Sequence, residues 1–241
     1  MQKQNQLRWR KLILSPNMPQ FKKYILCLLL IISSLDTVLA QEENYGRWFV
    51  YFGNQKINNK WLLQSDMQYR LNQIPTQKSQ LLLRAGIGYN LTESNNNILL
   101  GLAYVQSNWE DGDKAMPSTI EKRVYQQYLY KQKRNNLFLT HRVRMEERFI
   151  ANDFALRYRY FLSVQKPLNG KLLNRRSLYV SGFNELFIDI SKQKFDRNRF
   201  FTGIGYGVTN DIRLETGYLI QSQKNSTRGQ FQLIVYNNLS F

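Results

Sequence analysis

The stretch FQLIVYNNLSF, from Phe231 to Phe241, alternates between two kinds of side chain. Its odd positions carry phenylalanine, leucine and valine with one asparagine, and its even positions are mostly polar. Successive side chains of a β-strand point to opposite faces, so a period of two predicts a strand whose two faces meet different environments. We therefore expect a strand here with one apolar face and one largely polar face.

The same alternation recurs along the chain after residue 40. The segments are 9 to 15 residues long, whereas the strands of soluble sheets usually have about 5 or 6. A tilted strand crosses a bilayer in about 9 to 11 residues, so these lengths favour membrane-crossing strands. The clear segments are Trp61–Leu71, Leu81–Tyr89, Leu137–Phe149, Leu156–Val164, Phe200–Val208, Ile212–Ile220 and Phe231–Phe241, and the weaker ones are Arg47–Gln55, Ile98–Trp109, Thr119–Lys133 and Ser177–Ile190.

The number of segments conflicts with a general rule. Eleven segments are found, but single-chain bacterial barrels use an even number of strands. We therefore expect an all-β fold, an antiparallel transmembrane β-barrel of 12 strands with 10 as the alternative, in one domain covering residues 41–241. Its last segment ends on Phe241, and a final amphipathic strand ending in an aromatic residue resembles the closing strand of bacterial outer-membrane barrels, so Phe241 is the candidate assembly signal.

Residues 1–40 have the layout of a cleaved signal peptide. Lys22 and Lys23 precede a short apolar run, and Val38-Leu39-Ala40 then offers small residues at the cleavage positions. We expect cleavage between Ala40 and Gln41, with residues 18–40 as the functional part, because Met18 is a plausible start. The single cysteine, Cys27, lies in the removed part, which excludes disulfides and thiol chemistry from the exported chain.

The charge of the chain is strongly positive, at +17. The signal segment carries six basic residues and one acidic residue, so the exported chain keeps an excess of twelve positive charges. Export argues against nucleic acid as a partner for these charges, and lipopolysaccharide phosphates suit them better. We expect an outer-membrane location, with outer-membrane lipids, lipopolysaccharide, periplasmic chaperones and the barrel-insertion machinery as partners. No run of 18 apolar residues follows Gln41, so helical membrane spans are not expected.

The run His141 to Arg148 carries the most charge. On a strand, Arg142, Arg144, Glu146 and Arg148 share one face, and apolar neighbours on the other face place this row in the lumen. Two interpretations remain open, an ion-pair ladder that fills the lumen and a basic constriction that favours anions. Other charged side chains are expected to line the lumen with this row, namely Asp66, Arg70, Arg84, Arg157, Arg159, Glu185, Arg199, Arg213 and Glu215.

An enzymatic alternative depends on His141, the only histidine. Membrane-embedded barrel hydrolases pair a serine with a histidine, so a lipid- or lipopolysaccharide-modifying activity using His141 is the second hypothesis. By parity His141 faces outward with Leu139 and Val143, and no serine lies in a nucleophile motif. No metal-ligand spacing and no cofactor motif occurs, so neither a metal nor a cofactor is expected.

Several short stretches together resemble a known family. They are Trp48, Lys60-Trp61, the run from His141 to Arg148, Leu156 to Tyr160, Asn184 to Phe187, Phe195 to Arg199, and Glu215 to Tyr218. The pattern is similar to that of the family called domain of unknown function 2490 (DUF2490), outer-membrane proteins common in Bacteroidota. The resemblance implies an outer-membrane β-barrel, and it implies no activity, substrate or catalytic residue.

Overall fold

The computed structural model describes residues 46–71, 77–92, 95–111 and 114–239 of the 241-residue chain. All of them belong to one compact unit, Asn44–Phe241. The expected signal peptide and Phe241 lie outside the described residues. The strands are β1 (Gly46–Lys56), β2 (Trp61–Leu71), β3 (Gln77–Asn90), β4 (Asn96–Asp111), β5 (Lys114–Arg134), β6 (Leu137–Ile150), β7 (Asp153–Pro167), β8 (Leu178–Asp189), β9 (Lys194–Gly207), β10 (Ile212–Gln223) and β11 (Ser226–Asn237).

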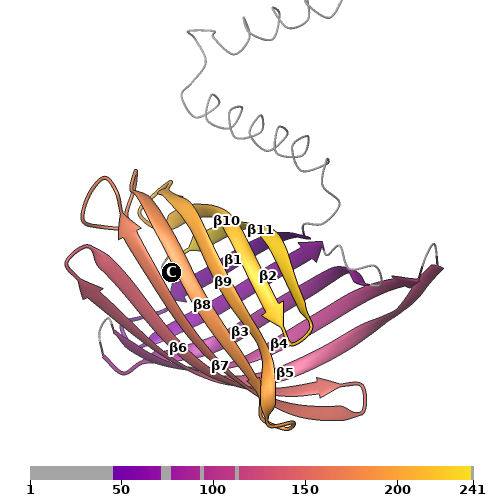
Figure 1. Ribbon diagram of the computed structural model, residues 1–241. Coiled ribbons are helices and arrows are strands. Elements are labelled where there is room, and N and C mark those ends of the chain that lie inside the picture. The colour runs from indigo at the N-terminus through magenta and orange to yellow at the C-terminus, as the bar shows by residue number, and fades with distance from the viewer. Residues whose placement is uncertain (1–45, 72–76, 93–94, 112–113, 240–241) are drawn as a thin grey trace, which may run out of the picture. The chain divides into compact units, whose positions relative to one another are not determined.

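The strands form a closed barrel in which each strand pairs with its neighbours in the chain (Figure 1). Closure joins β1 to β11 in a parallel ladder that runs from Gly46 opposite Gln230 to Gly53 opposite Asn237. Every other pair is antiparallel. The described residues contain no helix long and apolar enough to cross a membrane.

The expected strand number was wrong. The described residues form eleven strands rather than twelve or ten, and one of the eleven pairs is parallel. With an odd number of alternating strands, β1 and β11 run in the same direction, so they can close the barrel only as a parallel pair. The even-number rule assumed an antiparallel closure, and the eleven segments found in the sequence correspond to the eleven strands.

The two ends of the barrel are defined by its connections. The mouth end carries the connections after β1, β3, β5, β7 and β9, and the base end carries those after β2, β4, β6, β8 and β10. The connection at residues 168–177 at the mouth end is held by hydrogen bonds between Asn169 and the backbone of Arg176 and Leu178. The β5–β6 connection is a two-residue turn with Asn135 at positive φ.

Alternation separates the two faces of the barrel wall. On β4, Leu100 and Leu102 point outward and are 60% and 64% exposed, whereas Leu99 and Val105 point inward and are buried. Each of the strands β1 to β10 carries at least one large exposed apolar side chain of this kind. On β11, the half-buried Phe231 and its neighbours of the same parity hold the outward positions. The barrel exterior is therefore largely apolar, with polar interruptions such as Lys122, Gln126 and Glu147 on β5 and β6.

Glycines create space for large inward side chains at two places. Gly203 and Gly217 are cross-strand partners, and a Cβ on either would lie 2.7 or 2.6 Å from Cζ of Phe201. A Cβ on Gly205 would lie 2.1 Å from Cζ of Tyr179. Because glycine has no side chain, the rings of Phe201 and Tyr179 can pack directly on the backbone of the neighbouring strand.

One part of the interior is apolar. Trp48, Val50, Phe201, Leu219 and Ile234 form a buried cluster on β1, β9, β10 and β11, which we call the apolar wall. Phe52, Phe183 and Tyr236 pack against it. The rings of Phe183 and Phe201 stack with centroids 4.9 Å apart. The other half of the interior, centred on β5 to β8, is mainly charged, and Leu99, Ala103 and Tyr125 form a second, smaller apolar cluster on β4 and β5.

Candidate functional site

The charged half of the interior is centred on Glu146 of β6, which is completely buried. Nε and Nη2 of Arg157 donate to Oε2 of Glu146 at 3.0 and 2.5 Å, and Nη1 of Arg159 donates to Oε1 at 2.5 Å. Nη1 of Arg123 and Nη1 of Arg144 lie 3.7 Å from the same carboxylate. Four guanidinium groups therefore surround one carboxylate. Such charge-assisted hydrogen bonds are stronger than neutral ones.

Two further carboxylates extend this network. Oε1 of Glu185 on β8 accepts from Nη2 of Arg142 at 2.7 Å and from Nη2 of Arg159 at 2.6 Å. Because Arg159 also contacts Glu146, it joins the two carboxylates. On β5, Oε1 of Glu121 accepts from Nε of Arg123 at 2.7 Å and from Nε of Arg148 at 2.5 Å. Arg199 lies 3.9 Å from Glu185 and also belongs to this network. We call the network the Arg–Glu cluster; its members are Glu121, Glu146, Glu185, Arg123, Arg142, Arg144, Arg148, Arg157, Arg159 and Arg199.

Aromatic rings cover the faces of several arginines. The guanidinium carbon of Arg159 lies 4.5 Å from the ring centroid of Phe187, and that of Arg199 lies 4.7 Å from it. The ring centroid of Trp48 lies 4.1 Å from the guanidinium carbon of Arg70 and 5.0 Å from that of Arg199. Cation–π contacts stabilise desolvated cations, so the rings help to keep these charges inside the barrel.

Positive charge exceeds negative charge in the interior. Six carboxylates are buried or half-buried there, those of Asp66, Glu121, Glu146, Glu185, Asp196 and Glu215. Eleven arginines accompany them, which leaves five positive charges without a carboxylate of their own. These arginines are Arg70, Arg84, Arg123, Arg142, Arg144, Arg148, Arg157, Arg159, Arg197, Arg199 and Arg213.

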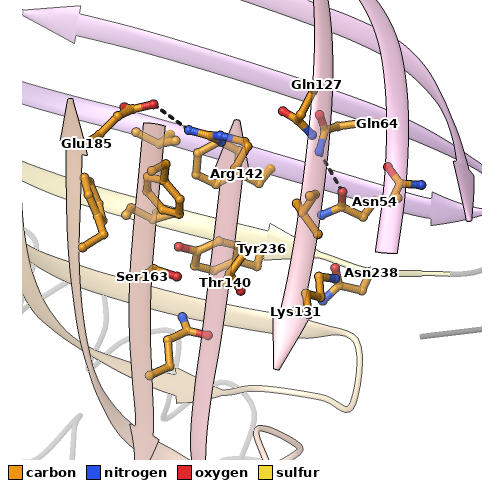
Figure 2. Close-up of a pocket in the computed structure, with 18 of the residues that line it drawn as sticks. Asn54, Gln64, Gln127, Lys131, Thr140, Arg142, Ser163, Glu185, Tyr236 and Asn238 are labelled. Atoms are coloured by element: carbon orange, nitrogen blue, oxygen red, sulfur yellow. Dashed lines mark hydrogen bonds and ion pairs between the residues drawn. The ribbon is translucent and has the colours of Figure 1, made fainter. Parts of the chain in front are cut away.

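A cavity of about 500 Å³ occupies the mouth-end part of the interior (Figure 2). Alternate residues of β1 from Trp48 to Lys56 line the cavity, so it extends about 26 Å along this strand. Arg84, Gln127, Arg142 and their neighbours form its floor. Figure 2 shows Arg142 and Glu185 joined at this floor, with Lys131 and Asn238 nearer the mouth.

The Arg–Glu cluster begins at this floor and extends toward the base end. Its members Arg142, Arg159, Glu185 and Arg199 line the cavity, whereas Glu146, Arg144 and Arg157 are buried and do not line it. A second hollow at the base end, of about 490 Å³, is lined by Arg148, Asp196 and the β8–β9 and β10–β11 connections. The two hollows share no lining residue, and the cluster stands between them.

The structure brings the expected lumen residues together to different degrees. Most are nearly inaccessible, and Arg142, Arg148 and Arg213 are half-buried. Asp66 and Arg84 form a separate ion pair of 2.7 Å on β2 and β3, and Glu215 accepts from Gln165 at 3.3 Å. The nearly inaccessible residues of the set are Asp66, Arg70, Arg84, Arg144, Glu146, Arg157, Arg159, Glu185, Arg199 and Glu215.

Sequence reasoning missed Glu121, Arg123 and Gln127 on β5, which belong to the network. Their outward neighbours include Lys122 and Gln126, so β5 has no clean apolar face to reveal its alternation. A signal was nevertheless present. A two-residue turn between β5 and β6 fixes their register, and that register sets Arg123 opposite Arg148.

His141 lies on the outer face of β6, as its parity predicted. Its Nδ1 is 2.9 Å from the Tyr160 hydroxyl, and its ring lies beside that of Tyr130, with centroids 6.1 Å apart. No carboxylate is hydrogen-bonded to it among the described residues, so the orienting member of a Ser–His–acid arrangement is not present there. Within the same residues, no group of three or more His, Cys, Asp or Glu side chains is placed to hold a metal ion.

The fold defines the class of protein. It is a closed β-barrel with a largely apolar exterior and a charged, partly hollow interior. The sequence model of the family described as "Protein of unknown function (DUF2490)" matches residues 45–232. The chain therefore belongs to this family. Comparison with curated proteins gives no match, and comparison with solved structures gives none either.

Proposed function

We propose that this protein is an outer-membrane β-barrel whose lumen is closed by the Arg–Glu cluster, so that it acts as a structural barrel rather than as an open pore. The observation that carries the location is the apolar exterior. Side chains such as Leu100, Leu102 and Ile204 are more than half exposed and point away from the interior. Soluble proteins rarely expose this much apolar surface, whereas the hydrocarbon core of a membrane favours it.

Aromatic pairs near both barrel ends support the same proposal. Trp61 and Tyr89 are cross-strand partners at the mouth end, with ring centroids 5.0 Å apart. Phe149 and Phe154 are partners at the base end, with centroids 5.4 Å apart. Aromatic side chains concentrate at the two interfaces of membrane barrels, where their rings bridge hydrocarbon and water. Export, chaperoned transit and membrane insertion are part of this proposal.

The closed lumen rests on the buried cluster. An anion pore needs hydrated positive charges along a continuous path, but Glu146 and its arginines are buried and separate the two hollows. The lipid-modifying alternative has less support, because His141 faces outward and contacts tyrosines.

Fractionation combined with planar-bilayer recording tests both parts. We expect the processed protein in the outer-membrane fraction, with heat-modifiable gel mobility and no stepwise conductance. A soluble periplasmic protein would contradict the location. Single-channel steps that favour anions would replace the closed lumen with the narrow anion pore.

A further inference from the structure

We propose that the mouth-end cavity is a binding site for a small acidic saccharide, meaning a sugar that carries a carboxylate or a phosphate. The anionic group would lie on the arginine floor and the hydroxyl groups along the amide-rich wall. This inference rests on the proposed closed lumen, because the cluster provides the floor on which the ligand would stop.

The unpaired groups at the floor are all hydrogen-bond donors. Nε and Nη1 of Arg84, Nε of Arg142, Nε2 of Gln127 and Nε1 of Trp48 belong to residues that line the cavity, and they are buried without a hydrogen-bond partner. Arg84 and Gln127 are more than nine-tenths buried. A buried donor that is left unpaired destabilises the folded protein, and more so when it is charged. Because Arg84 and Arg142 line the cavity, a rotation of their guanidinium groups would bring these donors to a ligand that accepts hydrogen bonds, such as a carboxylate or a phosphate.

The charge balance points the same way. The interior holds five more arginines than carboxylates, and Arg84 and Arg142 both line the floor, so their like charges repel each other. Arg142 has one carboxylate partner, Glu185, which it shares with two other arginines. An anion bound at the floor would reduce this repulsion, so the site favours negatively charged ligands in general.

The other residues that line the cavity indicate the chemistry of the uncharged part of the ligand. Eleven of the lining residues are asparagine or glutamine, among them Asn54, Gln64 and Asn97. An amide both donates and accepts, as does a sugar hydroxyl. Beside Asn54, the rings of Phe52 and Tyr236 line the cavity with centroids 5.5 Å apart, and the apolar faces of sugars pack on such rings. A purely apolar acid would leave the amides unpaired.

Calorimetric titration of the folded protein in detergent at low salt tests the inference. The probes are glucuronate, glucose 6-phosphate, glucose, inorganic phosphate and decanoate. We expect glucuronate or glucose 6-phosphate to bind with a Kd below about 1 mM, and the other three to bind at least about tenfold more weakly. Glucose binding equally well would overturn the anionic floor. Inorganic phosphate or decanoate binding as tightly as the sugar acids would overturn the saccharide assignment.

A matched pair of arginines locates the site. Arg142→Gln removes a floor arginine that pairs with Glu185, and Arg148→Gln removes an arginine that pairs with Glu121 outside the cavity. Their side chains are 17% and 16% exposed, so the two changes are closely comparable. We expect Arg142→Gln to weaken binding about tenfold or more, and Arg148→Gln to change it by less than about twofold. Equal losses would show diffuse charge attraction and overturn the site.

A second variant covers the possibility that Arg142→Gln fails to fold. This variant is Lys131→Gln. Lys131 lies at the mouth, and its side chain is exposed and lines the cavity. It should fold, with heat-modifiable mobility, and bind glucuronate about threefold more weakly or worse. Unchanged binding would contradict the placement of the ligand. If no probe binds, this inference is overturned and the proposed function is unaffected. The proposed function is tested separately, by bilayer conductance and by fractionation, and is overturned by channel conductance or by a soluble location.

Discussion

The two halves of the barrel interior are held together in different ways. The apolar wall packs Phe201, Leu219 and Ile234 against one another with no polar partner to satisfy. The Arg–Glu cluster instead holds charges whose burial is tolerated because each carboxylate meets two or more guanidinium groups. Burial of apolar area is stabilising by itself, whereas a buried ion pair roughly balances the cost of desolvation and becomes strongly destabilising when one partner is lost. The charged half should therefore be the more sensitive to single substitutions.

Glu146→Gln should have the largest effect on stability. The change keeps the shape of the side chain but leaves Arg157, Arg159 and two further guanidinium groups without their shared carboxylate. We expect the free energy of unfolding to fall by about 3–5 kcal/mol, as measured by urea titration in lipid vesicles with heat-modifiable gel mobility as the readout.

The adjacent Glu147 provides the control for this substitution. It lies on the outer face and accepts one hydrogen bond from Gln126 at 3.2 Å. Glu147→Gln should change the free energy of unfolding by less than about 1 kcal/mol. If both glutamates gave the same loss, the difference between a buried network and an outward charge would not hold.

Phe201→Ala should come next in size. The ring is fully buried, stacks on Phe183 and fills the space left by Gly203 and Gly217. Its removal leaves a cavity, so we expect a loss of about 3 kcal/mol in the same urea titration. Phe200→Ala, on the outward face and 50% exposed, should cost clearly less. An equal cost would mean that the apolar wall is not tightly packed.

Gly205→Ala should have an intermediate effect, through overpacking. The new Cβ would lie 2.1 Å from Cζ of Tyr179, so the ring must move, and we expect a loss of about 1–3 kcal/mol. Gly182→Ala is the matched control, because its Cβ would meet only a backbone oxygen at 3.5 Å. Thermal unfolding of the two variants side by side measures the difference, and a Gly205→Ala variant as stable as Gly182→Ala would contradict the tight fit.

Periodicity made much of this fold predictable from the sequence. Alternation alone separates the residues that face the lumen from those that face outward. Only one of the two possible assignments keeps the charged side chains of a strand off its apolar face, since a shift by one residue would exchange the two faces. This is why parity was sufficient to assign Glu146, Arg157 and Glu185 to the interior, where all three are buried. The closing pair could not be found in the same way, since the parallel ladder of β1 and β11 joins the two ends of the barrel sequence.

The partners within the interior were also beyond the sequence. Parity says that Arg159 faces inward, but not that it joins Glu146 on one neighbouring strand to Glu185 on the other. Which arginine meets which carboxylate depends on strand stagger and on rotamers, and these emerge only when the barrel closes. The floor of the cavity depends on the same information, because Arg84 and Gln127 come from β3 and β5, which do not pair with each other.

His141→Phe should have the smallest effect of these substitutions, because His141 lies outside both halves of the interior. The change removes one contact with the Tyr160 hydroxyl, of 2.9 Å, and keeps an aromatic ring beside Tyr130. We expect the free energy of unfolding to change by less than about 1.5 kcal/mol, the net worth of a single hydrogen bond. Lipid A and phospholipid profiles of cells that carry only this variant should match those of the wild type. A Tyr160→Phe variant loses the same contact but keeps the histidine, so altered lipids in His141→Phe alone would restore the enzymatic hypothesis and assign a chemical role to the outer surface.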